Sequence, residues 1–400
     1  MGALLSWVDF SPSDRDRMRR AIALFQERST VDELGLGTIR DVFAEAFFPG
    51  TSTIMTRLRY FLFVPWVYRN LEASRATADD VAQRARTAEL ALVDPIDRSE
   101  DALGNIGRVA RESLLRLPSS TYWAGLQRWR VCCFAGTQDE YHRQFDAIRD
   151  RRRHAPKPDD DGVTPDRSDT WHPRLPEPPP GWPDEVSFHL TRAEAEFLQG
   201  RIAESCSGTP LAILAMHGRK ADDVDYLWES PDLARMPTDM RALVDLARRF
   251  SLVMHGAALL YNLMLSEQKQ HGDWTDSYRA QLDAWARSTE AEDLQRFDPG
   301  TLFTTLDHRE ARIPSPTRRF VTTWAQNLAS RDPRSVATDD AFRLLVKDRE
   351  RTIKGARSRF TNRRALDQWG GASGAWRLSF RWPIARRLLN DLHTALSETR

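Results

Sequence analysis

The sequence has few cysteines and no long apolar run, and each absence excludes a class of protein. Its 400 residues contain three cysteines, Cys132, Cys133 and Cys206, and no CxxC pair. Adjacent cysteines cannot easily bridge each other, so a disulfide scaffold is excluded. No window approaches the roughly 20 apolar residues that cross a bilayer, and the first residues lack the basic and apolar regions of a secretory signal. We therefore expect a reduced, cytoplasmic protein that does not contact a membrane.

Motifs of the common enzyme classes are missing as well. The nine histidines never occur at metal-ligand spacings such as HExxH, and neither a GxSxG elbow nor a GxxxxGK loop is present. The SEQK stretch with Glu267 and Lys269 is similar to the end of a nuclease motif, but it lies in a predicted helix with no preceding sheet carboxylate. His217 and His255 lie in apolar stretches and are predicted to be core histidines. We predict no catalytic residue, no metal and no cofactor.

The rest of the chain is organised around one strongly apolar stretch. Residues 48–71 read FPGTSTIMTRLRYFLFVPWVYRNL, and residues 60–68 are almost entirely aromatic or aliphatic. A run of this kind is too short for a membrane span and cannot face water, so we predict a central core helix. Phe61 and Trp66 are expected to be almost fully buried. Pro65 is expected to kink or end the helix, because its ring removes a donor and clashes one turn back.

Apolar residues at helical spacing and capping residues predict helices along most of the chain. Ser11 is placed to cap a helix over 11–27, Thr38 to cap one that ends near residue 47, and Thr191 with Glu194 forms a capping box. The other predicted helices span 77–92, 106–117, 122–134, 137–152, 238–270 (one long helix or two), 273–288, 317–330 and 383–396. Only RLSFRW, residues 377–382, looks strand-like. We therefore predict a mainly α, multi-helical fold with little β structure.

A change of composition divides the chain. Nine prolines and an acidic run at 159–161 fall between residues 153 and 187. Such a segment forms neither a ladder nor a helix and buries little surface. Because 400 residues exceed what one hydrophobic core usually serves, we predict two helical units, 1–152 and 188–400, joined by this Pro-rich linker. Trp171 and Trp182 are expected to anchor the linker to a surface.

Charge is balanced overall, with 58 basic and 57 acidic residues, but it is concentrated near the C-terminus. Residues 343–387 carry thirteen Lys or Arg against three Asp or Glu, a local net charge of +10, with aromatic residues interleaved. Basic side chains neutralise phosphates and aromatic faces stack on bases, so this segment predicts sequence-independent binding of DNA or RNA. The alternative is a solvated basic helix with its aromatic residues buried. The predicted binding residues are Lys354, Arg357, Arg359, Arg363, Arg364, Trp369, Trp376, Arg377 and Arg381.

The PGTST turn before the core helix is a second candidate site. Backbone N–H groups and hydroxyls at a helix start, with two arginines one turn on, can hold a phosphate or sulfate. In the alternative, the turn is a plain helix cap, and Arg57 or Arg59 pairs with a carboxylate such as Asp41 or Glu45. The alternative is favoured because no Walker lysine follows. The predicted anion-binding residues are Thr51, Ser52, Thr53, Arg57 and Arg59.

Three stretches carry a family resemblance. They are WVDFS near the start, DELGLGTIRDVFAEAFFPGTSTIMTRLRYFLFVPWVYRNLE, and KGARSRFTNRRALDQWGGASGAWRLSFRWPIARRLLNDLH near the end. Together they resemble an uncharacterised prokaryotic family, domain-of-unknown-function family 6361. The resemblance reaches both ends of the chain but does not include the Pro-rich segment. It implies an accessory role in phage defence beside helicases and phospholipase-D-like nucleases, and it assigns no catalytic residue.

Three functions from different classes remain open. The first is a nucleic-acid-binding accessory protein of a phage-defence system. The second is a non-enzymatic scaffold whose aromatic surface binds a helicase or nuclease partner, and an enzyme with an unrecognised site is a third. A steep salt dependence of nucleic-acid binding would separate the first from the second.

Overall fold

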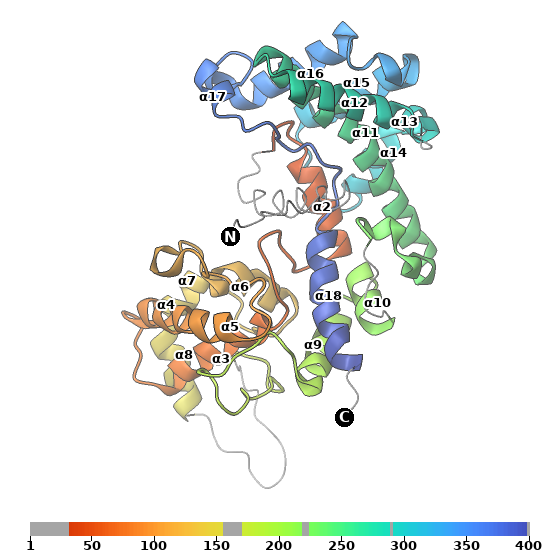
Figure 1. The fold of residues 1–400 in the computed structure, drawn as a ribbon. Helices are drawn as coiled ribbons and strands as arrows, with labels where there is room; N and C mark the ends of the chain where they lie inside the picture. Colours follow the sequence, from red (N-terminus) through yellow and green to blue (C-terminus); the bar gives the residue numbers. More distant parts are fainter. Residues whose placement is uncertain (1–31, 155–169, 218–223, 289–290, 398–400) are drawn as a thin grey trace, which may run out of the picture. The chain divides into compact units, whose positions relative to one another are not determined.

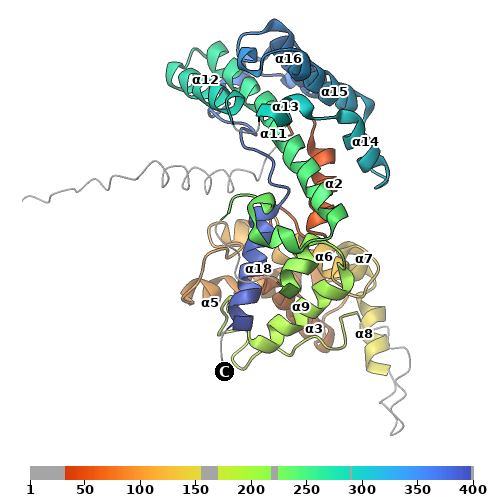
Figure 2. The ribbon, with the colours of Figure 1, turned by 90° about the vertical axis from the view of Figure 1, so that its right-hand side faces the viewer.

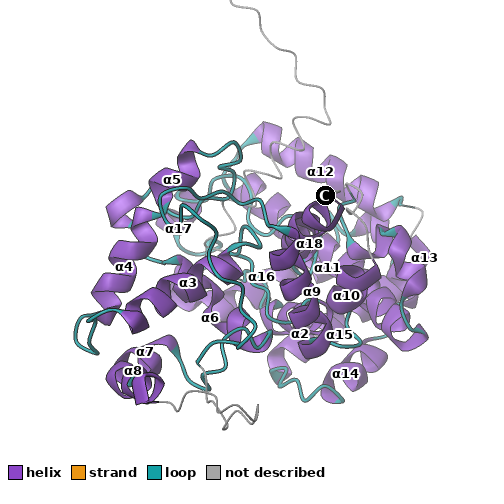
Figure 3. Cartoon of the chain, turned by 90° about the horizontal axis from the view of Figure 1, so that it is seen from below, coloured by secondary structure: helices purple, strands orange, loops and turns teal. Residues whose placement is uncertain are grey.

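The computed structural model describes residues 32–154, 170–217, 224–288 and 291–397. Within these ranges the chain consists of helices and loops without a strand, as Figure 3 shows. A single isolated antiparallel bridge in the described chain joins Cys132 to Trp171. The predicted mainly α, multi-helical fold is therefore confirmed. The helix predicted over 11–27 lies outside the described residues.

The chain forms two compact units. We call them the α11 unit, Met1–Arg40 with Arg249–Leu378, and the α3 unit, Asp41–Arg248 with Ser379–Arg400. Two of the three boundaries between them fall inside helix α2, Gly37–Phe47, and helix α11, Thr238–Gln268, and the third lies between Leu378 and Ser379. This division differs from the predicted one, since residues 152 and 188 both belong to the α3 unit.

The α3 unit is built around helix α3. Helix α3 contacts α4, α6 and α8, whereas α9, α10 and α18 pack side by side as a second layer of this unit (Figures 1 and 2). The helices of the unit are α3 Tyr60–Ala73, α4 Val81–Ala91, α5 Val93–Arg98, α6 Pro118–Arg128, α7 Gln138–Arg143, α8 Phe145–His154, α9 Arg192–Ser205, α10 Pro210–His217 and α18 Trp382–Ser397. The 3₁₀ turns are η2 Arg111–Ser113, η3 Leu227–Glu229 and η4 Pro231–Arg235.

The predicted core helix is confirmed, with two differences in its ends. Phe61 is 0% exposed and Trp66 is 1% exposed, and the ring of Phe61 stacks on that of Trp129 with centroids 3.9 Å apart. Helix α3 continues through Pro65 to Ala73, so the proline does not end it. The helix begins only at Tyr60 and has no side-chain cap, so the prediction that the PGTST turn caps it is wrong.

The described part of the predicted linker packs on α3. Trp66 donates its Nε1–H to the carbonyl of Pro176 at 2.7 Å, and Trp171 donates to Glu72 at 2.9 Å. The ring of Trp182 meets that of Trp66 edge to face, with centroids 5.0 Å apart. These aromatic contacts explain why residues 170–187 belong to the α3 unit and do not lie between two units. Residues 155–169 lie outside the described ranges.

Two local predictions are wrong for the same physical reason. Residues 106–117 form no α-helix, because Gly104 and Gly107 have φ of +91° and +97° and turn the chain repeatedly. The RLSFRW piece is not a strand, because Phe380 and Arg381 have φ of +51° and +68° and form the turn into α18. Positive φ at non-glycine residues is uncommon and is not visible in apolar periodicity.

The α11 unit surrounds the second part of α11, which is one continuous helix. Trp285 of α12 and Trp324 of α15 donate their indole N–H groups to the carbonyls of Leu252 and Val253, at 2.9 and 3.0 Å. Helix α15 contacts α13, α14 and α16. The helices of this unit are α12 Gly272–Ala286, α13 Ala291–Arg296, α14 Pro299–Asp307, α15 Ser315–Ser330, α16 Asp340–Lys354 and α17 Arg363–Asp367, with 3₁₀ turns η5 Pro333–Ser335 and η6 Gly355–Arg357.

Candidate functional site

Lys354 and Arg359, two of the predicted nucleic-acid-binding residues, form buried or half-buried ion pairs within the α11 unit. Glu33, which precedes α2, accepts hydrogen bonds from Lys354 Nζ and from Arg359 Nη1, the latter at 2.8 Å. Arg359 also donates to the hydroxyls of Tyr261 at 2.9 Å and Ser373 at 3.1 Å. The side chains of Glu33 and Lys354 are only 10% and 9% exposed. Lys354 and Arg359 therefore hold the end of α16 and the loop after it to the segment that precedes α2.

A second buried carboxylate fixes the loop that follows α16. Glu350 is 0% exposed and accepts hydrogen bonds from the Ser358 hydroxyl and from the backbone N–H of Arg359, the latter at 2.9 Å. A buried carboxylate is tolerated when hydrogen bonds of this kind satisfy it. The loop that carries Arg357 and Arg359 is therefore held at a defined place in the unit.

Other basic residues of the 343–387 segment also have internal partners. Arg349 donates to the carbonyl of Leu34 at 2.9 Å and to the hydroxyl of Thr317 at 2.8 Å, and burial lowers the pKa of its guanidinium. Arg343 pairs with Glu267 at 2.5 Å. Several basic side chains of the segment are thus bonded to groups inside the unit. Neither the binding prediction nor its solvated-helix alternative includes such internal pairing.

The segment after α17 forms a strap, which we define as residues 369–378, along one side of α11. His255 contacts the carbonyl of Ala375 at 3.0 Å, and Asn262 binds both the N–H and the carbonyl of Ser373 at 2.8 Å. Lys269 donates to the carbonyl of Trp369 at 2.8 Å. His255 and Asn262 of α11 and Lys269, one residue past its end, are spaced by seven residues, so they lie on one stripe. The strap has no ladder of its own, and side chains of α11 and Tyr278 of α12 are among its hydrogen-bond partners.

Four of the predicted ligands remain at the surface of the α11 unit. Arg357 and Arg364 are exposed, and neither forms an ion pair with any residue that the structure describes. The side chain of Arg363 is 78% exposed and pairs with Asp367, one turn away, at 3.2 Å. Trp376 is 44% exposed. These are the members of the predicted set that solvent reaches freely.

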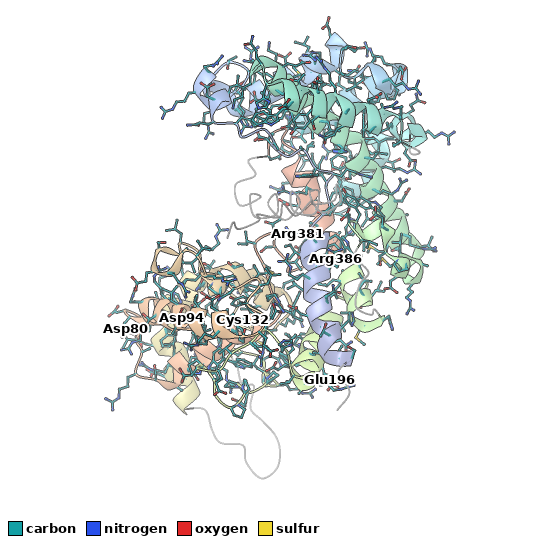
Figure 4. The ribbon with its side chains drawn as sticks, in the orientation of Figure 1. Asp80, Asp94, Cys132, Glu196, Arg381 and Arg386 are labelled. Carbon is teal, nitrogen blue, oxygen red and sulfur yellow. The ribbon has the colours of Figure 1, made fainter. Side chains whose placement is uncertain are left out.

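The remaining predicted ligands lie elsewhere. Trp369 is 2% exposed and packs edge to face on Trp274. Arg377 is half-buried at the end of the strap. Arg381 belongs to the α3 unit, where it donates to the carbonyl of Thr51 at 2.7 Å and to Glu45 at 3.3 Å, next to the start of α18 (Figure 4). Trp369 therefore cannot stack on a base without leaving its packed position.

The PGTST turn uses its groups internally as well. Arg57 donates from Nε to both carboxylate oxygens of Asp391 at 3.1 and 3.0 Å and pairs with Asp101 at 2.5 Å. Arg59 pairs with Glu194 at 2.8 Å and donates to the carbonyl of Ser187 at 2.9 Å. Both arginines are thus paired with carboxylates, although not with Asp41 or Glu45. The carboxylates stand where an anion would have to bind.

The hydroxyls of this turn are arranged for local structure. Thr51 is buried, and its hydroxyl donates to the carbonyl of Phe48 at 2.7 Å. Ser52 is half-buried and Thr53 is exposed. Burial raises the pKa of Asp391, while its hydrogen bonds from Arg57 and from the N–H of Leu58 act in the opposite direction. The buried ion pair between Arg57 and Asp391 therefore occupies the position predicted for a bound phosphate.

The residues considered for catalysis are engaged structurally. Lys269 binds the carbonyls of Trp369 and Asp367, and Glu267 pairs with Arg279 and Arg343. His255 is half-buried, and desolvation of its ring lowers its pKa to about 4 and keeps the ring neutral at physiological pH. His217 is exposed at the end of α10, so its prediction as a core histidine is wrong. In the described ranges, no group of three or more His, Cys, Asp or Glu is arranged to hold a metal ion.

A wide, open pocket of about 1050 Å³ lies in the α3 unit, between α6 and the loop that leads to α7. Trp123, Gln127, Arg130 and Phe134 contribute to its lining. Gln127 donates to the carbonyl of Phe134 at 2.8 Å and Trp123 donates to that of Gly136 at 3.0 Å, so the loop is rigidly attached to α6. None of the sequence-predicted site residues lines this pocket.

Comparison with known proteins identifies a family for the chain. A model described as a family of unknown function, DUF6361, matches residues 2–396. The chain belongs to this family. No curated protein and no solved structure matches the chain. Among the helices of the described ranges, none is both long enough and apolar enough to cross a membrane.

Proposed function

We propose that this DUF6361 protein is a sequence-independent nucleic-acid-binding accessory component of a prokaryotic phage-defence system. The observation that carries the proposal is the exposed set Arg357, Arg363 and Arg364 on the surface of the α11 unit. Their neighbours Lys354 and Arg359 bind Glu33, so the backbone that carries the exposed arginines is held in place. Phosphate contacts made by ordered arginines position a nucleic acid without reading its bases.

The exposed arginines can bind a phosphate at little energetic cost. The pair between Arg363 and Asp367 is exposed, and pairs of this kind contribute at most about 1 kcal/mol, so a phosphate competes with it readily. Arg357 and Arg364 form no ion pair among the residues described. Guanidinium groups bind phosphate oxygens through two parallel hydrogen bonds, which favours nucleic acid over a simple counterion.

Fluorescence anisotropy with labelled DNA and RNA at several salt concentrations tests the proposal. We expect the logarithm of the affinity to fall linearly with the logarithm of salt concentration, because each arginine that neutralises a phosphate releases counterions. Replacing Arg357, Arg363 and Arg364 by Ala is expected to reduce the magnitude of this slope by about one unit for each arginine that binds a phosphate in the wild type.

A matched control removes three exposed arginines elsewhere. Arg84, Arg192 and Arg287 are each half-exposed or more and pair with a carboxylate four residues away, as Arg363 does. Their triple Ala variant removes the same charge and is expected to keep the wild-type slope. Wild-type protein that retains no nucleic acid at low salt, or a control variant whose slope falls as much as that of the test variant, would overturn the proposal.

A specific observation favours the scaffold as the second candidate. Val109 and Leu115 are 96% and 100% exposed in a loop of the α3 unit, which is unusual for large aliphatic side chains. The loop is nevertheless well fixed, since Arg86 donates to the carbonyl of Leu114 at 2.9 Å and the hydroxyl of Tyr60 accepts from the N–H of Ile106 at 2.9 Å. A rigid apolar display of this kind suits a protein partner such as a helicase or nuclease.

The scaffold candidate has its own test. Val109→Ser and Leu115→Ser should abolish co-purification with a helicase or nuclease encoded beside this gene, with thermal stability unchanged. Retained co-purification by the double variant would remove this loop as the contact surface.

A further inference from the structure

We infer that the nucleic acid bound by the α11 unit is single-stranded, with a base stacked on Trp376. The inference rests on the proposed function and specifies its substrate class. Its starting observation is that Trp376 is the large aromatic residue of the strap that faces solvent, at 44% exposure, while Trp369 at the other end of the strap is 2% exposed. An exposed indole combined with guanidinium groups along the same path is the arrangement with which proteins bind single strands regardless of sequence.

The backbone on both sides of Trp376 is immobilised by α11. The carbonyl of Ala375 contacts Nε2 of His255 at 3.0 Å, and the carbonyl of Leu378 accepts from the hydroxyl of Ser251 at 2.9 Å. The neutral His255 ring suits the donation of one N–H to a carbonyl. Trp376 is therefore held out on a fixed backbone, and little conformational entropy is lost when a base stacks on it.

The strap runs antiparallel to α11, which fixes the distance between the exposed indole and the exposed arginines. His255 contacts residue 375, Asn262 contacts residue 373, and Lys269 contacts residue 369 and the carbonyl of Asp367 at the end of α17. From His255 to Lys269, which directly follows the last residue of α11, the rise at helical spacing is about 21 Å. Arg363 and Arg364, on α17, thus lie near one end of a track of this length and Trp376 near the other.

The two segments that carry the ligands are also joined directly. Nη1 of Arg359 lies 3.1 Å from the hydroxyl of Ser373, so the loop with Arg357 is held against the strap. The indole and the arginines therefore belong to one rigid surface of the α11 unit. A single strand that follows this surface meets an aromatic face and guanidinium groups within a few nucleotides.

The chemistry of stacking selects the single strand. In a duplex the faces of the bases are covered by their neighbours, and Trp376 could reach one only by unstacking the helix. A single strand exposes base faces, while its phosphates still neutralise the arginines. Every base has such a face, so this contact adds affinity without sequence preference.

The test compares Trp376→Ala and Trp376→Phe with wild type on a single-stranded oligonucleotide, on a hairpin duplex with the same number of phosphates, and on a single strand that lacks bases. Trp376→Ala is expected to weaken binding of the single strand that carries bases roughly 5- to 150-fold, the range found for loss of one aromatic stacking partner. Binding of the duplex and of the base-free strand is expected to stay within about twofold, because only phosphates are bound there. Trp376→Phe retains a ring and is expected to recover most of the loss.

Leu344→Ala is the matched control, since Leu344 is 59% exposed in the same unit and carries no ring. If Trp376→Ala binds the single strand that carries bases as well as wild type does, the inference is overturned while the proposed function stands. The same holds if the variant loses as much affinity for the base-free strand as for the strand with bases. If wild type binds none of the three probes, the proposed function fails, and the inference fails with it. Because Trp376 is exposed, its variants are expected to fold as the wild type does, and equal Tm values establish this directly.

Discussion

Arg57 and Asp391, which are 334 residues apart in the sequence, form a buried ion pair in which both carboxylate oxygens take part. Nε of Arg57 donates to both carboxylate oxygens, and the N–H of Leu58 donates to the same carboxylate at 2.9 Å. Both side chains are 10% exposed. The pair connects the loop before α3 to α18 within the α3 unit, and it accounts for the arginine that the PGTST prediction assigned to an anion.

Asp391→Ala should strongly destabilise the protein. Removal of one partner leaves the guanidinium of Arg57 buried with only Asp101 as a carboxylate partner, and losses of this kind typically cost about 3–5 kcal/mol. Urea unfolding gives the change in free energy. Asp367→Ala removes the exposed partner of Arg363 and should change stability by less than about 1 kcal/mol. Equal effects of the two variants would show that the Arg57–Asp391 pair is not buried in solution.

Phe61→Ala should be among the most destabilising single changes in the α3 unit. Its ring is fully buried, stacks on Trp129 and meets Tyr122 edge to face at 5.1 Å. Removal of a buried phenyl ring leaves a cavity and typically costs about 3–5 kcal/mol. Leu115→Ala, at a fully exposed site, is the control and should leave the unfolding midpoint unchanged. A fully stable Phe61→Ala variant would contradict the position of α3 at the centre of this unit.

The apolar pattern of the sequence identified the core helix, but the sequence did not show which charged side chains pair with each other. The run at 60–68 has no polar face, so its burial follows from composition alone, and the capping box of Thr191 and Glu194 is local enough to be read directly. The partner of Lys354 and Arg359 is Glu33, more than three hundred residues earlier, and no local pattern reveals that pairing. For the same reason the sequence alone does not separate the exposed arginines of the basic segment from those that form internal pairs.

Glu89 should make stability depend on pH. It is buried, at 3% exposure, and Oε2 accepts from the N–H of Ser119 at 2.7 Å, while Oε1 has no hydrogen-bond partner among the described residues. Burial raises its pKa from 4.5 to about 7. The native state therefore holds a proton that the unfolded chain releases, so this contribution is fully present below the unfolded pKa and is lost as pH rises through the folded one.

The size of this effect follows from the shift in pKa. A difference of about 2.5 units corresponds to roughly 3 kcal/mol of stability lost between about pH 4.5 and pH 7. Glu89→Gln is neutral at every pH and should remove that part of the pH dependence. The comparison is made by urea unfolding of both proteins over this range. Identical pH profiles for Glu89→Gln and wild type would show that Glu89 does not titrate in this way.

Cleavage in the Pro-rich segment should not separate the protein into two free fragments. The composition of residues 155–169 favours proteolysis there, but Trp171, Trp182 and Pro176 attach the following residues to α3. After limited proteolysis we expect two bands on a denaturing gel and one peak in native size-exclusion chromatography. Fragments that elute separately would support a division of the chain at the linker.

Gly256 and Gly200 form a matched pair of helical glycines with opposite predicted effects. A Cβ added at Gly256 of α11 would overlap the ring of Trp285, which packs on α11 and donates to the carbonyl of Leu252. Gly256→Ala must displace this ring and should cost about 1–3 kcal/mol, as overpacking of a filled core does. A Cβ at Gly200 of α9 meets no atom within 4 Å, so Gly200→Ala should gain about 0.5–1 kcal/mol from helix propensity alone. Urea unfolding of both variants checks the signs, and a stabilising Gly256→Ala would mean that Trp285 does not pack against α11 as described.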